Sequence, residues 1–378
     1  MSSRLSLYAP LLGAPGALAS SGSAVFVRAV TAILRNSGLE LRTRWLRADE
    51  GPRSDGHETT TLGHALYDSA RYLLFVYPLI PLPGSAGTRV SPPLAKTIFR
   101  ALRMKARLTR QRILVLVHEL PIEMQEGKAL AGEPTPGFDT AGMRATEAAL
   151  LGAAHRLALP AAFATPIQER HGVEPHRIFT FHRHPYLETA DPRNPPTQFD
   201  RGAVNFLYSG AVDSSVASNF REILKAIRNA PATRLHVCGP GREAVEGWLD
   251  ELDVPNVRHY GHLDADSHDW LARRCDVGLI LHPSDNSYNH LRPTLKYSAY
   301  LANGLAVLST DLKAVAANIR ADGVGLAMPI RELAVELMRW ATRPALWSEK
   351  KGKATEHGTV LRSGGEVRSW IERFTKPS

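Results

Sequence analysis

Short apolar runs alternate with stretches of helical periodicity along most of the chain. In the first half, the apolar runs predict strands at 5–9, 41–46, 73–80, 113–117, 161–164 and 178–181. Helical spacing of apolar residues there predicts helices at 24–36, 92–112 and 146–157. The second half repeats the pattern, with predicted strands at 204–209, 234–238, 257–260, 277–281 and 305–309. Helices are predicted at 219–229, 243–252, 267–274, 293–303, 330–343 and 366–374. This alternation in both halves predicts an α/β protein with two Rossmann-like doubly wound domains.

The domain boundary is predicted at a stretch rich in proline and poor in apolar residues, ADPRNPPTQFDRG. We therefore expect a first domain at 1–188, a linker at 189–202, a second domain at 203–360 and a C-terminal helix within 361–378. The 378 residues suit two domains, and 44% hydrophobic residues suffice for two cores.

The charge indicates an anionic partner. The formal net charge is +9, which leaves nucleic acid, an anionic membrane surface and phosphorylated substrates open. The most basic segment, 92–112, is either a helix with a solvated basic face or one that contacts anionic lipid headgroups. Aromatic residues make up only 7% and are not interleaved with that segment, which argues against nucleic acid.

The sequence also bears on compartment and on metals. Cys238 and Cys275 lie beside apolar runs, as buried reduced thiols do, which fits a cytoplasmic protein and leaves peripheral attachment at the inner face of the plasma membrane open. Prolines and glycines interrupt the apolar N-terminal stretch, so a first strand and glycine-rich loop is expected there rather than a secretory signal. The sequence contains no run of 18 or more apolar residues, so no transmembrane helix is predicted. His182 and His184 would share a face of a strand, but no partner lies at ligand spacing and no metal site is expected.

The most informative stretch is 275–328. Its strand ends in a polar loop, Pro293 opens a helix, and Gly304 follows the end of that helix. A loop rich in donors before a helix N-terminus suits a phosphorylated ligand; the alternative is an ordinary surface loop with a solvated lysine. The candidate ligand-binding residues of this stretch are Tyr288, Asn289, Arg292 and Lys296. Gly210 and Gly239 each follow a predicted strand, where glycine allows close approach of a phosphate or sugar, but neither forms a P-loop.

These residues also carry a family resemblance. The pattern P-x-x-K-x-x-x-Y-L-A-x-G-x-A-V-x-x-T-D resembles the nucleotide-sugar segment of GT-B glycosyltransferases, especially the retaining family four. The resemblance implies that Lys296 lies near the donor phosphates. In that family a glutamate three residues later holds the donor ribose, whereas this sequence has Ala299.

The resemblance extends to two more donor loops. Y-S-G-A-V-D-S-S resembles the loop in which the family carries an arginine and a lysine, but this chain has Asp213 and Ser214 there. If a diphosphate binds, Arg292, Lys296 and backbone amides must then neutralise it. Gly261 matches a loop that borders the nucleotide base.

On the acceptor side, His118-Glu119 resembles a histidine-containing loop of related transferases. His118 could move a hydroxyl proton, and Glu119 could orient it or act as the base itself. The alternative is a pair of polar residues capping the next element. Gly22 and His182 complete the candidate acceptor-side set.

The resemblance thus implies a GT-B glycosyltransferase, hexosyltransferase-like, with two domains facing a cleft and neither metal nor other cofactor. The nucleotide sugar would be a co-substrate and the acceptor a glycan or lipid-linked molecule, in bacterial surface or exopolysaccharide synthesis. One alternative is a GT-B-shaped nucleotide-sugar epimerase or phosphorylase. Another is a non-enzymatic protein that binds nucleotides or nucleic acid.

Overall fold

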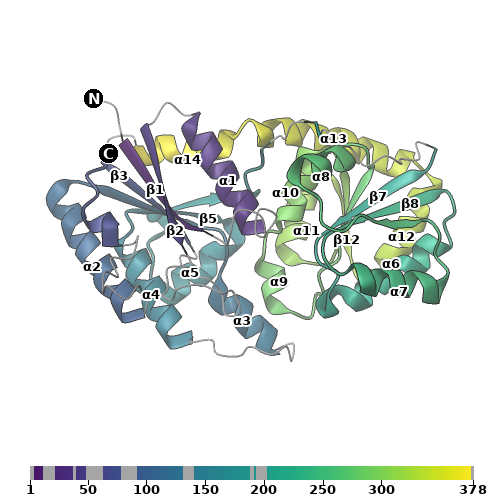
Figure 1. The fold of residues 1–378 in the computed structure, drawn as a ribbon, viewed down its shortest axis with the longest axis horizontal. Coiled ribbons are helices and arrows are strands. Elements are labelled where there is room, and N and C mark those ends of the chain that lie inside the picture. Colours follow the sequence, from purple (N-terminus) through teal and green to yellow (C-terminus); the bar gives the residue numbers. More distant parts are fainter. Residues whose placement is uncertain are drawn as a thin grey trace. The chain divides into compact units, whose positions relative to one another are not determined.

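The chain forms two compact α/β units. The computed structural model describes residues 4–11, 22–36, 40–47, 63–77, 92–130, 140–187, 191–192 and 202–375. Unit 1 comprises Met1–His182 with Gly365–Ser378, and unit 2 comprises Arg183–Gly364. Each unit holds a six-stranded parallel sheet with helices packed on it (Figure 1). This confirms the predicted class of two doubly wound domains.

Unit 1 has the strand order β2-β1-β3-β4-β5-β6. The strands are β1 (Arg4–Leu11), β2 (Glu40–Arg47), β3 (Tyr72–Tyr77), β4 (Arg112–Val117), β5 (Arg156–Pro160) and β6 (Ile178–Phe181). The main helices are α1 (Gly22–Arg35), α2 (Pro92–Thr109), α3 (Pro121–Leu130), α4 (Thr140–Ala153), α5 (Ala164–His171) and α14 (Gly365–Thr375), and the 3-10 turns are η1 (Gly63–Leu66), η2 (Ala161–Phe163) and η3 (Pro175–Arg177).

Side-chain alternation along β3 separates the two faces of this sheet. Phe75 meets Phe99 of α2 edge to face at 5.8 Å between ring centroids. Tyr72, on the opposite face, packs against Phe374 of α14 at 5.5 Å and donates its hydroxyl to the Thr375 carbonyl. The last helix of the chain therefore belongs to the core of unit 1 (Figure 1).

Unit 2 has the strand order β12-β11-β10-β7-β8-β9. Its strands are β7 (Val204–Ser209), β8 (Thr233–Cys238), β9 (Val257–His259), β10 (Val277–Ile280), β11 (Ala306–Thr310) and β12 (Gly325–Met328). Its helices are α6 (Ser214–Arg228), α7 (Arg242–Leu252), α8 (Ala265–Ala272), α9 (Ser287–Leu291), α10 (Leu295–Ala302), α11 (Lys313–Asp322), α12 (Ile330–Thr342) and α13 (Ala345–Arg362). The chain adds strands outward from β7 on one side and then crosses to β10 on the other. The order thus reverses between β7 and β10, where open parallel sheets bind their ligands.

Two local predictions were wrong, and one long helix was missed. Residues 161–164 are not a strand: they form η2 and the first residue of α5. The helix predicted at 146–157 is α4, which begins at Thr140 and ends at Ala153, because Leu157, Ala158 and Leu159 are buried in β5. Helix α13 was not predicted, since glycines usually weaken a helix. Its Gly358 instead allows close packing: a Cβ there would lie 2.2 Å from the Leu301 carbonyl oxygen of α10.

Gly278 in β10 packs directly against the ring of a buried tyrosine. A Cβ at this position would lie 2.3 Å from Cδ2 of Tyr300. The Tyr300 hydroxyl donates to the Leu279 carbonyl at 2.9 Å and accepts from the Ser209 amide at 3.1 Å, so the ring has little room to move. Tyr300 thereby fixes α10 against β7 and β10.

We expect Gly278→Ala to lower the free energy of unfolding by about 2–3 kcal/mol, because the added methyl overpacks a filled core. Urea unfolding measures this change. Gly247→Ala is the matched control, since a Cβ there meets no atom within 4 Å. It lies inside α7 and should be neutral or stabilising. A Gly278→Ala variant as stable as wild type would contradict the close packing of the Tyr300 ring on Gly278.

Candidate functional site

The switch point of unit 2 brings two predicted site residues into contact. Gly210 directly follows β7 and has a φ of +144°, which favours glycine. A Cβ on Gly210 would lie 2.7 Å from Cε and 2.9 Å from Nζ of Lys296, so the lysine side chain rests on the bare backbone of this residue. The lysine comes from the first turn of α10, which follows β10. The loops on both sides of the reversal therefore meet at Lys296.

Three glycine turns lie side by side beyond β7, β8 and β9. The Gly210 amide donates to the Cys238 carbonyl at 2.8 Å, and the Gly239 amide donates to the Gly261 carbonyl at 2.8 Å. A Cβ on Gly239 would lie 2.3 Å from the Gly210 carbonyl oxygen. The structure thus brings Gly210, Gly239 and Gly261 together as closely packed backbone at the carboxyl edge of the sheet.

Lys296 is paired with a histidine that the sequence analysis did not single out. Its Nζ lies 3.0 Å from Nε2 of His282. Burial, followed by the nearby charges of Lys296 and Arg292, lowers the pKa of His282 well below its ordinary value, so the ring is neutral and Nε2 accepts from the ammonium group. Thr310 at the end of β11 donates its hydroxyl to the His282 carbonyl at 2.6 Å and helps to fix this residue. The sequence signal that could have identified His282 was its position directly after the apolar run 277–281.

The pKa of Lys296 is lowered to about 7. Burial is the main cause and the positive charge of Arg292 adds to it, while Asp213 opposes the shift. A lysine with a pKa near neutrality gains a proton readily when an anion approaches. The pair of Lys296 and Arg292 can therefore neutralise a phosphate group at this edge of the sheet.

Two other residues predicted to bind the ligand lie in the segment between β10 and α10. Tyr288 and Asn289 are both buried in the short helix α9. The Asn289 amide donates to the Pro283 carbonyl at 3.0 Å. This contact folds the loop back on itself. Arg292 follows α9 and is only partly buried.

Ser214 is exposed at the start of α6. The residue before it, Asp213, caps the helix and accepts a hydrogen bond from the Ser215 amide at 3.0 Å. Because a carboxylate already occupies this helix end, the first turn of α6 is a poor site for a phosphate. Neutralisation of an anion therefore falls to Lys296 and Arg292 rather than to the loop after β7.

A second polar group beside Gly210 was also missed. The Ser209 hydroxyl lies 2.7 Å from Nε2 of His268, and Nδ1 of His268 lies 3.2 Å from the carboxylate of Asp269. The order serine, histidine, aspartate resembles a hydrolytic triad, but the amide after Ser209 donates to the Cys238 carbonyl and offers no oxyanion hole. The group is better suited to holding a hydroxylated ligand next to Lys296.

In unit 1, His118 and Gly22 belong to neighbouring elements. His118 follows β4, is buried, and stacks on Phe26 of α1 with 5.0 Å between ring centroids. Gly22 is the first residue of α1. Glu119 is partly buried. These positions lie at the carboxyl edge of the sheet, where ligands of parallel sheets bind.

The two histidines predicted to share a strand face do not do so. β6 ends at Phe181, and the unit boundary falls directly after His182. Nε2 of His184 lies 2.6 Å from the Pro293 carbonyl, within unit 2. The prediction failed because the turn to Pro185 ends the strand early.

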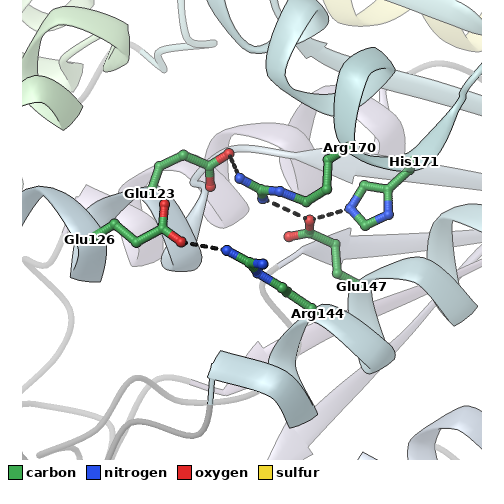
Figure 2. A network of polar contacts seen from close by, with 6 residues as sticks. All are labelled: Glu123, Glu126, Arg144, Glu147, Arg170 and His171. Carbon is green, nitrogen blue, oxygen red and sulfur yellow. Dashed lines mark hydrogen bonds and ion pairs between the residues drawn. The ribbon is translucent and has the colours of Figure 1, made fainter.

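A network of charged side chains joins helices α3, α4 and α5 (Figure 2). Arg170 of α5 contacts Glu123 of α3 at 2.6 Å and Glu147 of α4 at 3.2 Å. His171 also contacts Glu147, whose side chain is fully buried, at 2.6 Å. Burial raises the pKa of Glu123, and the Arg170 guanidinium opposes the shift. The network ties three helices together and fixes the start of α3, just after the His118-Glu119 pair.

Among the described residues, no group of three or more His, Cys, Asp or Glu side chains could hold a metal ion. None of the helices in that part of the chain is long and apolar enough to cross a membrane. Cys238 and Cys275 are buried as free thiols, and burial raises the pKa of both, that of Cys238 to about 12.

Comparison with solved structures identifies the fold. Neither a protein-family model nor a curated protein sequence matches the chain. Sucrose-phosphate synthase from Thermosynechococcus elongatus matches with a TM-score of 0.65 and 13% identity, over 98% of each chain. WaaG, a glycosyltransferase of lipopolysaccharide biosynthesis, matches with a TM-score of 0.58 and 15% identity, over 99% of this chain and 100% of its own. Anabaena Alr3699/HepE, solved in complex with UDP, matches with a TM-score of 0.61 and 9% identity, over 98% of each chain. The chain has the GT-B fold. In this chain the switch point with Lys296 lies in the C-terminal of the two sheets.

Proposed function

We propose that this protein is a glycosyltransferase that takes a sugar from a nucleoside-diphosphate donor. The observation that carries the proposal is Lys296, a lysine with a pKa of about 7 that rests on Gly210 at the switch point of unit 2. The resemblance of its segment to family four and the fold shared with several glycosyltransferases support the same proposal.

The chemistry requires that the leaving diphosphate be neutralised. Negative charge grows on it as the bond to the sugar breaks, and fixed positive groups stabilise that charge in the transition state. Lys296 and Arg292 supply the charges, and Gly210 leaves room for the lysine side chain against its backbone. Ser209 and His268 lie next to Gly210, where they would meet a hydroxyl group of the donor. No metal is needed for this neutralisation.

Unit 1 would bind the acceptor, with His118 or Glu119 near the reacting hydroxyl. The nearly neutral pKa of an ordinary histidine suits the transfer of that proton. Gly22 and His182 remain candidates for acceptor contact. We propose a glycan or lipid-linked acceptor, transfer of a hexose, a role in bacterial surface or exopolysaccharide synthesis and action at the cytoplasmic face of the plasma membrane.

Thermal unfolding in the presence of UDP, GDP, ADP and CMP tests the donor site. We expect at least one nucleoside diphosphate to raise the Tm of the wild type, because a ligand that binds only the folded state stabilises it by mass action. The same nucleotide should not shift Lys296→Met. Lys225→Met, which removes an exposed lysine paired with Glu222, should respond as the wild type does. If none of the nucleotides raises the Tm of the wild type, the proposed donor site is wrong.

The products separate the transferase from other enzymes of this fold. Incubation of the protein with a nucleotide sugar that it binds should release nucleoside diphosphate in proportion to the acceptor added. Epimerisation of the sugar would instead indicate an epimerase. Release of free sugar in the absence of acceptor would indicate a hydrolytic enzyme.

A further inference from the structure

The outward face of α2 combines arginines with exposed apolar side chains. The helix carries Lys96, Arg100, Arg103, Lys105 and Arg107 and no acidic residue. Positions 100, 103, 104, 107 and 108 follow the i, i+3, i+4, i+7, i+8 spacing that puts residues on one helix face, and all five are exposed. An ordinary solvated face would mix both signs of charge and would not present methionine and leucine.

The apolar part of this face continues onto a neighbouring turn. Leu108 is 81% exposed and Met104 is 68% exposed. Tyr67, directly after η1, is 86% exposed, and these are the three most exposed large apolar side chains in the described ranges. Lys105 of α2 donates to the carbonyls of Ala65 and Asp68, so η1 and Tyr67 lie beside the helix. The apolar side chains thus border the arginines along one surface.

Further arginines lie at the amino edge of the sheet. Arg71, Arg112, Arg156 and Arg177 lie at the amino ends of the neighbouring strands β3, β4, β5 and β6. Burial lowers the pKa of Arg177, the charges of Arg103 and Arg156 lower it further, and Glu174 opposes the shift. Among the described residues, no carboxylate forms an ion pair with Arg71, Arg100, Arg103, Arg107 or Arg156. The guanidinium groups therefore repel one another and would be stabilised by an external anion.

We propose that unit 1 docks on an anionic phospholipid surface through these residues. Arginines would meet the headgroups while Met104, Leu108 and Tyr67 enter the boundary with the acyl chains. The exposed apolar side chains favour a membrane over nucleic acid, because they gain little from a phosphate backbone. This docking surface lies on α2 and the amino edge of the sheet, whereas His118 follows the carboxyl end of β4, so docking does not cover His118. The inference depends only on unit 1 and not on the proposed donor chemistry.

Co-sedimentation of the full chain with lipid vesicles tests this surface. We expect binding to vesicles of phosphatidylcholine mixed with phosphatidylglycerol, and little binding to phosphatidylcholine alone. Arg103→Gln/Arg107→Gln should weaken the partition coefficient by roughly 25-fold, since each charge near an anionic surface contributes about fivefold. Met104→Ser/Leu108→Ser should weaken it by a similar factor at low salt and should abolish the binding that persists at high salt.

Matched controls come from exposed positions of unit 2. Val335→Ser/Val360→Ser removes the two other exposed large apolar side chains, and Arg331→Gln/Arg343→Gln removes two exposed arginines. Both double variants should bind vesicles as the wild type does. Equal losses in these controls would overturn the proposal, as would binding that depends on the arginines alone and is stronger to polynucleotide than to vesicles. Nucleotide-dependent Tm shifts should be unchanged in all four variants, so failure of this surface and failure of the donor site are distinguishable.

Discussion

Lys296→Met is expected to lower kcat/KM for the nucleotide sugar by roughly 10³-fold, because it removes a charge that stabilises the leaving diphosphate. Steady-state kinetics with the donor identified by thermal shift measures this loss. The variant should fold at least as well as the wild type. Methionine fills the same volume on Gly210 and removes the cost of burying an ammonium group. That gain outweighs the lost hydrogen bond to His282, so we expect a net gain of about 1 kcal/mol at pH 6.5. An active variant would contradict the role of this lysine.

The same lysine predicts a pH dependence with a definite sign. Because the pKa of Lys296 is about 7 in the folded protein, the group is mostly neutral above that pH. An anionic diphosphate stabilises the protonated form, so binding takes up a proton and the affinity falls as pH rises above 7, by up to about tenfold per pH unit. Calorimetry in buffers of different ionisation enthalpy measures the uptake. The uptake should persist in Lys225→Met, whereas Lys296→Met should show no binding heat under the same conditions.

Protein stability should follow the same linkage. The folded-state pKa of about 7 lies below the ordinary value of 10.5, so the unfolded chain binds more protons between these values. The contribution of Lys296 to stability therefore improves as pH rises through that window and is least favourable below pH 7. The stabilising effect of methionine should accordingly shrink toward pH 10.

The elements that carry the donor site could be predicted because their signals are local. The buried run 277–281 is fully apolar, and Pro293, the Thr294 cap and Gly304 punctuate a single helix. The position of Lys296 in the first turn of α10 follows directly from these residues. The order of the strands does not, since nothing local says that β10 pairs with β7. That pairing is what brings Lys296 onto Gly210.

Long-range contacts explain the rest of what was missed. The low pKa of Lys296 comes from burial, which depends on how α10 docks through Tyr300 onto two strands. His268 meets Ser209 across 59 positions of sequence, so no spacing pattern could reveal the pair. By helix propensity alone, Gly358 argues against a helix at α13. The close approach of its backbone to Leu301, which a Cβ would block, explains why glycine is there.

Arg170→Met should destabilise unit 1 by about 3–5 kcal/mol, because it leaves Glu123 and Glu147 without the guanidinium that they share (Figure 2). Urea unfolding measures the loss. Arg144→Met is the matched control: its ion pair with Glu126 is about half exposed on both sides and should contribute less than about 1 kcal/mol. A loss in Arg170→Met no larger than in the control would contradict the importance of the network.

The pH dependence of this loss separates charge from packing. Burial already raises the pKa of Glu123, and removal of Arg170 raises it further. A carboxyl whose pKa is raised on folding favours the folded state below its unfolded pKa of 4.5, and this contribution is lost as pH rises. The deficit of Arg170→Met should therefore be larger at pH 7.5 than at pH 5, and Glu123→Gln/Glu147→Gln/Arg170→Met should regain much of it. A deficit that does not change with pH would mean that the guanidinium acts through packing alone, and the start of α3 beside His118 would then be held by shape rather than by charge.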